Sequence, residues 1–87
     1  MKLTSVKTVE INKYIVANPE ICHGKLTFKG TRVMVSLVLE MLEAGASYEE
    51  ILEAYPSLAR EHIKAALGFA AKAAERGFDT AKALATA

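Results

Sequence analysis

The sequence has few of the residues that build large cores. It contains no Trp, only three Phe and three Tyr, although apolar residues make up 52% of its 87 residues. A core with so few aromatic side chains is thin, and small proteins with thin cores are commonly stabilised by oligomerisation. We therefore expect a single domain over residues 1–87 that forms a dimer.

Cysteine and long apolar runs are also scarce. One Cys excludes an internal disulfide, and the amino terminus lacks the charged, apolar and small-residue pattern of a signal peptide. The longest apolar run, Val33 to Leu39, is interrupted by Ser36. It is far shorter than the roughly 20 residues of a membrane-spanning helix. We expect a cytoplasmic protein without a membrane partner.

Residues 1–32 have the pattern of an N-terminal arm followed by a β-hairpin. Tyr14–Val16 and Leu26–Phe28 are short runs of β-forming residues. Asn18-Pro19 ends the first run, and His23-Gly24 is typical of a turn. Residues 1–12 alternate loosely between apolar and polar, which predicts a weak strand or a partly ordered arm.

Two glycines border the second predicted strand. Gly24-Lys25 and Gly30-Thr31-Arg32 resemble pieces of phosphate-binding loops, but neither has the full glycine spacing. The interpretation that we favour is structural, with Gly24 and Gly30 adopting backbone angles that other residues avoid. Thr31 and Arg32 would then tie the hairpin to the following helix, with Arg32 donating to backbone carbonyls or to a carboxylate such as Glu20.

From residue 33 to residue 77 the pattern is helical and predicts a three-helix bundle. The first helix begins near Val35, and Gly45 follows it as a left-handed C-terminal cap. Ser47 and Glu50 have the spacing of a capping box, which predicts a second helix over Tyr48 to Ala54. The expected apolar faces of these two helices consist of Val35, Val38, Leu39, Met41, Leu42, Ile51, Leu52 and Tyr55.

Pro56 ends the second helix, and Ser57 can cap a third that closes at Gly77. The expected buried row of the third helix is Leu58, Ile63, Ala66, Leu67, Ala70 and Ala74. Residues 78–87 form a C-terminal tail. The fold class is therefore mainly α, with a short N-terminal β-hairpin before a tri-helical bundle.

Three helices with a tight second connection are the framework of a helix-turn-helix unit, whose last helix enters the DNA major groove. The net charge of +1 leaves nucleic-acid binding open, so the local distribution of charge must decide. Four cations on the third helix recur at a spacing of four, with Gly68 in the same row: Arg60, Lys64, Lys72 and Arg76. They predict a cationic ridge opposite the apolar row that contacts phosphates. The alternative is an ordinary solvated helix face. Glu61 and Glu75 on the same helix favour it, because they reduce the positive charge of the ridge.

Cys22-His23 suggests a nucleophile or a metal ligand. A zinc site needs about four ligands, and a catalytic Cys needs a positioned His. His62 is the only other His, and we expect it on the surface of the third helix beside Glu61. We favour a half-buried thiol beside a turn, and expect no enzyme activity, cofactor, metal or small-molecule substrate.

An ordered series of motifs resembles the family called domain of unknown function 433 over roughly Tyr14 to Ala71. The motifs are Ile21-Cys22-His23-Gly24-Lys25, Gly30-Thr31-Arg32-Val33, Gly45 to Leu52, Tyr55-Pro56-Ser57-Leu58 and Ile63 to Leu67. His23 stands where the family commonly has a second Gly, and Leu26 and Met34 stand where Pro is usual.

The resemblance implies a homeodomain-like helix-turn-helix protein that dimerises through its N-terminal strands. It also implies an antitoxin that neutralises a PIN-type toxin and represses its own operon by binding the operator DNA. The alternative is a stand-alone DNA-binding regulator without a toxin. A small enzyme or metal protein that uses Cys22 and His23 is the third possibility.

Overall fold

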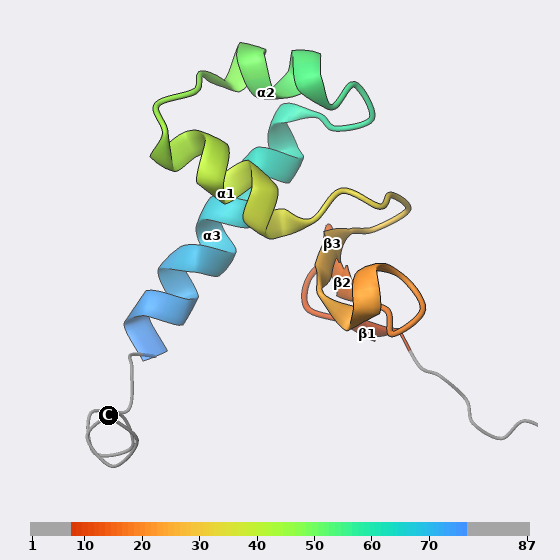
Figure 1. Ribbon diagram of the computed structural model, residues 1–87. Coiled ribbons are helices and arrows are strands. Elements are labelled where there is room, and N and C mark those ends of the chain that lie inside the picture. The colour runs from red at the N-terminus through yellow and green to blue at the C-terminus, as the bar shows by residue number, and fades with distance from the viewer. Residues whose placement is uncertain (1–7, 77–87) are drawn as a thin grey trace, which may run out of the picture.

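The computed structural model describes residues 8–76, which form a small sheet followed by three helices (Figure 1). The predicted tail 78–87 and the predicted closure of the third helix at Gly77 lie outside the described residues. The elements are β1 (Val9–Glu10), β2 (Ile15–Ala17), β3 (Leu26–Phe28), α1 (Val35–Glu43), α2 (Tyr48–Ala54) and α3 (Arg60–Arg76). The predicted fold class, a mainly α chain with N-terminal strands, is confirmed.

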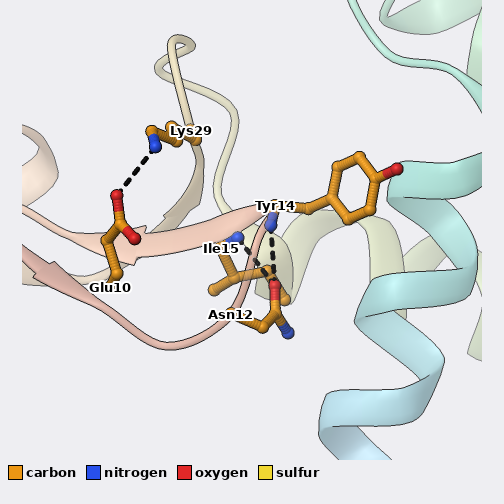
Figure 2. Close-up of polar contacts among 5 residues, drawn as sticks. All are labelled: Glu10, Asn12, Tyr14, Ile15 and Lys29. Carbon is orange, nitrogen blue, oxygen red and sulfur yellow. Dashed lines mark hydrogen bonds and ion pairs between the residues drawn. The ribbon is translucent and has the colours of Figure 1, made fainter.

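Within the described residues the sheet has three antiparallel strands in the order β1-β2-β3. β2 and β3 form the predicted hairpin, and β1 lies where the sequence predicted a weak strand or a partly ordered arm. β2 is the central strand: Val9 of β1 pairs with Ala17 along one edge of β2, and Phe28 of β3 pairs with Ile15 along the other edge. The side chain of Asn12 forms the β1–β2 turn by accepting hydrogen bonds from the backbone N–H of Tyr14 (2.8 Å) and of Ile15 (3.0 Å) (Figure 2). Lys29, just after β3, forms an ion pair with Glu10 of β1 at 2.7 Å, which links the outer strands across β2 (Figure 2).

A left-handed turn, Cys22–Gly24, connects β2 to β3. All three residues have positive φ: 52° at Cys22, 58° at His23 and 83° at Gly24. The N–H of Gly24 donates to the carbonyl of Ile21, and that of Lys25 to the carbonyl of Cys22. A left-handed residue with a Cβ atom costs roughly 1–2 kcal/mol, so Cys22 and His23 hold this turn under strain. A Gly at position 23, which the resemblance to the family implied, would adopt this conformation without the strain.

The junction between β3 and α1 is held by Thr31, as predicted. Its hydroxyl donates to the carbonyl of Phe28 (2.8 Å) and accepts from the N–H of Val33 (3.0 Å). Gly30 has φ +80°, the left-handed conformation predicted for it. Arg32 behaves differently, because its side chain is exposed and forms no bond to a carbonyl or to Glu20 within residues 8–76.

Local signals define the ends of α1 and the beginning of α2. Gly45 has φ +94°, and the N–H groups of Gly45 and Ala46 donate to the carbonyls of Leu42 and Met41. This is the Schellman arrangement. The capping box is also confirmed: the Glu50 N–H donates to Ser47 Oγ at 3.1 Å, and the Ser47 N–H donates to Glu50 Oε1 at 2.8 Å.

The beginning of α3 differs from the prediction. The helix begins at Arg60, so Ser57 lies in the preceding turn and is not its cap. His62 Nδ1 accepts a hydrogen bond from the N–H of Ala59 at 2.9 Å, the role that a Glu or Gln three residues into a helix has in a capping box. A side chain from within the helix therefore replaces the expected cap.

One core joins the sheet and the three helices. It consists of Ile15, Phe28, Val35, Val38, Ile51, Leu58, Ile63 and Ala66. The predicted apolar positions on α1 and α2 all belong to this core or pack against it. On α3 the predicted row is only partly buried, because Leu67 is 40% exposed and Ala74 is exposed. In Figure 1 the C-terminal end of α3 extends away from α1 and α2. Leu67 lies nearer the middle of the helix and is exposed although its neighbour Ala66 is buried, because the two side chains point to different sides of α3.

None of the helices in the described part of the chain has the length and apolar character that crossing a membrane requires.

Candidate nucleic-acid interface on α3

The α2–α3 pair has the order of a helix-turn-helix unit. The connection 55–59 lies between the two helices, and the Leu58 N–H donates to the carbonyl of Tyr55 at 3.0 Å within it. Leu58 is buried and anchors the connection in the core. The first half of α3 is therefore held rigidly against α2, and its outer face is open to solvent.

Arg60, the first residue of α3, is held by α2. Its guanidinium forms an ion pair with Glu49 at 3.3 Å and lies 5.0 Å from the centre of the Tyr48 ring. Both side chains of the ion pair are more than half exposed, so its contribution to stability is small. These contacts orient Arg60 at the helix beginning, where they also partly neutralise it.

Lys64 follows one turn later and is fully on the exposed face. Leu67 and Gly68 continue that face, and a Cβ atom built on Gly68 would meet no heavy atom within 4 Å. The surface beyond Lys64 is open at Gly68, which also lines a hollow with Lys72 and Arg76. A second macromolecule can approach this part of the helix closely.

Lys72 and Arg76 lie in a different environment. Both line a hollow of about 290 Å³ between the C-terminal half of α3 and the Ile11-Asn12 turn, with Phe69 and Ala73 in its wall. Residues four apart advance 40° beyond a full turn, so Arg76 is rotated by roughly 160° from Arg60. The predicted single ridge is thus divided into an outer pair, Arg60 and Lys64, and a pair beside the hollow, Lys72 and Arg76.

The charge on α1 and α2 has the opposite sign. No Lys or Arg occurs between Arg32 and Arg60 in the sequence. Exposed carboxylates fill this interval, at Glu40, Glu43, Glu49, Glu50 and Glu53. The prediction of a phosphate-binding ridge considered α3 alone and did not include these acidic side chains. Their negative charge would repel phosphate brought close to α2.

The three residues considered for catalysis have structural surroundings. Cys22 is half-buried, as predicted, and its thiol lies 3.6 Å from the carbonyl oxygen of Arg32. His23 is exposed in the strained turn. His62 is not a free surface residue, because its ring packs against Tyr14 and Phe28 with centroid distances of 5.1 and 5.6 Å. Within residues 8–76, no three His, Cys, Asp or Glu side chains are grouped in a way that could hold a metal ion.

Comparison with known proteins agrees with the motif series. A family model described as "Protein of unknown function (DUF433)" matches residues 15–70, which run from β2 through most of α3. The chain belongs to the DUF433 family. The match includes the left-handed turn, both helix caps and the outer cations Arg60 and Lys64, whereas β1, Lys72 and Arg76 lie outside it.

A curated relative carries no functional description. The DUF433 chain is 42% identical over 52 residues to "Uncharacterized protein y4eO" of Sinorhizobium fredii (strain NBRC 101917 / NGR234). The aligned part covers 60% of this chain and 24% of the relative, so the chain spans about a quarter of the relative's length. No solved structure matches.

Proposed function

We propose that this chain is an antitoxin-like, DNA-binding dimer that neutralises a PIN-type toxin and represses its own operon. It has no enzymatic role in this proposal. The observation that carries the DNA-binding part is the exposed face of the first half of α3, where Arg60 and Lys64 stand on a helix held rigidly against α2.

The two outer cations are the principal phosphate contacts in this proposal. Arg60 and Lys64 lie one turn apart near the N-terminus of the helix that enters the major groove in helix-turn-helix proteins. Lys72 contributes less, because it is rotated by roughly 120° from Arg60 and lines the hollow. Arg76 contributes least, because it is rotated by roughly 160° from Arg60.

The acidic surface of α2 restricts how DNA can approach. Glu49 and Glu53 are exposed beside α3, and phosphates close to them would be repelled. A duplex that lies along Lys64 and Gly68 avoids this repulsion better than one centred on the α2–α3 corner. The open surface at Gly68 allows the DNA backbone to come close there.

The dimer is supported by the free edge of β1. In the described part of the chain β1 is an outer strand, and Val9 and Ile11 beside it are 55% and 42% exposed. The other outer strand is partly covered, because Thr27 forms an isolated bridge with Met34. Pairing of two β1 edges would bury the exposed apolar side chains and satisfy free backbone groups.

A gel-shift titration with the DNA upstream of the gene tests the DNA contact. The Arg60→Glu and Lys64→Glu variants are each expected to weaken binding strongly, and Lys13→Glu, with the same charge change in the β1–β2 turn, to change it little. Each lost phosphate contact lowers the dependence of log K on log salt by about 0.9. Equal binding by all three variants would rule out α3 as the contact.

Co-purification with the product of the neighbouring gene tests the toxin part. A stable complex with a small nuclease, and loss of its toxicity in cells that express both proteins, is the expected result. Specific DNA binding without any such partner would favour the stand-alone regulator.

A further inference from the structure

In the described part of the chain, the hollow beside the C-terminal half of α3 is lined by apolar side chains and by polar side chains that are free to donate hydrogen bonds. Ile11, Phe69 and Ala73 form its apolar floor, and Lys72, Arg76 and the amide of Asn12 are the polar groups. The Asn12 oxygen is already occupied by the N–H groups of Tyr14 and Ile15 (Figure 2), which leaves its NH₂ as the group free to bond. Among residues 8–76, no carboxylate lines the hollow. It therefore complements an apolar side chain that is accompanied by an acidic group.

A second hollow of about 270 Å³ lies on the other side of Phe69. Its apolar wall comes from Leu26, Val35 and Leu39, and Lys25 is the only charged residue of the described ones that lines it. The half-buried ring of Phe69 is common to both hollows. The molecule thus has two adjacent apolar hollows. Lys25 lines one, and Lys72 and Arg76 line the other.

We propose that these two hollows are the docking site for an acidic segment of a partner protein that places an apolar side chain on each side of Phe69. A small carboxylate would occupy only one of the two hollows. Nucleic acid has phosphates for the cations but no apolar side chains for the floor. This inference goes beyond DNA binding. Arg60 and Lys64, the principal phosphate contacts of the proposed function, line neither hollow, whereas Gly68 and Lys72 line the first.

Fluorescence anisotropy with designed probes tests the proposal on the full chain. The probe is a short labelled peptide of Leu and Glu, and the control peptides replace Glu by Lys or Leu by Ser. The Leu–Glu peptide is expected to bind and both controls to bind at least roughly tenfold more weakly, because each lacks one half of the complementarity. Equal binding of the Leu–Lys peptide would overturn the proposal.

Charge reversal locates the site. The double variant Lys72→Glu/Arg76→Glu is expected to bind the Leu–Glu peptide roughly tenfold more weakly and the Leu–Lys peptide more tightly. The matched control Arg60→Glu/Lys64→Glu has the same charge change on the same helix, and is expected to lose DNA binding and to keep peptide binding. If both double variants lose the peptide equally, attraction is non-specific and the proposal fails.

Two further measurements test whether the peptide lies in the hollow and whether a second copy of this chain occupies it instead. Ala73→Gln, which places a longer side chain in the floor, is expected to weaken peptide binding with an unchanged melting temperature. Unchanged peptide binding by this variant would refute the assignment of the floor. A change in oligomeric state of the protein alone on Lys72→Glu/Arg76→Glu, seen by sedimentation, would assign the hollows to a second copy and overturn the proposal.

Discussion

The imidazole ring of His62 stands edge-on to the ring of Phe28, with a centroid distance of 5.6 Å and an interplanar angle of 85°. The same ring meets Tyr14 at 5.1 Å, and its Nδ1 atom caps α3 through the N–H of Ala59. One side chain therefore begins the longest helix and attaches that helix to the sheet.

His62 variants separate these two roles. His62→Gln keeps an acceptor for the Ala59 N–H but loses the ring contacts, and His62→Phe does the reverse. Each is expected to lower the free energy of unfolding by about 1 kcal/mol, and His62→Ala by about 2–3 kcal/mol, because it removes both. Urea denaturation measures the three values. An Ala variant no less stable than the other two would contradict the double role.

Thr27 is expected to be a site where removing a polar group stabilises the protein. Its side chain is fully buried, and its hydroxyl has no hydrogen-bond partner among the described residues. Thr27→Val keeps the shape and removes the unpaired group, so the free energy of unfolding is expected to rise by about 1 kcal/mol. Thr27→Ser, which keeps the hydroxyl and loses the methyl group, should be less stable than the wild type. A destabilised Val variant would show that the hydroxyl has a partner.

The left-handed turn gives a prediction about backbone strain. His23→Gly is expected to stabilise the protein by up to about 1 kcal/mol, because relief of the φ +58° strain exceeds the added entropy of the unfolded chain. His23→Ala keeps the strain and should give no such gain. Gly24→Ala should be destabilising because a residue with a Cβ atom is strained at φ +83°. A steric clash would not be the cause, because the nearest neighbour of the added Cβ is Pro19 Cα at an ordinary 3.7 Å. Thermal unfolding of the three variants provides the comparison.

The ion pair between Arg60 and Glu49 gives a prediction about DNA affinity. Glu49→Gln frees the Arg60 guanidinium and removes a repulsive charge, so DNA binding is expected to strengthen about threefold at low salt. Because the pair is exposed, stability should change by less than about 1 kcal/mol. Glu43→Gln, the same change on α1, is the control and should have a smaller effect. Equal gains in the two variants would indicate a general charge effect.

Features that depend on residues within about four positions of one another could be predicted from the sequence. The capping box of Ser47 and Glu50, the left-handed Gly45 and the Thr31 bridge all form as expected, because each consists of bonds inside one short segment. The three helices follow for the same reason, except for the beginning of α3, where the bond from the Ala59 N–H to His62 is local and was still not predicted. So does family membership, since the motifs are themselves short and ordered.

Contacts between distant segments could not be predicted in this way. The pairing of Val9 and Glu10 with β2 decides where the weak strand expected in residues 1–12 lies, and the packing of α3 buries Ala66 but leaves Leu67 exposed on another side of the helix. The candidate site shows the same division. The sequence by itself determined that Arg60, Lys64, Lys72 and Arg76 recur every four residues on one helix. Only the tertiary structure decided that α2 holds the first of them and that the last two line a hollow with the β1–β2 turn, because a helix turns by 100° per residue and its neighbours cover each side differently.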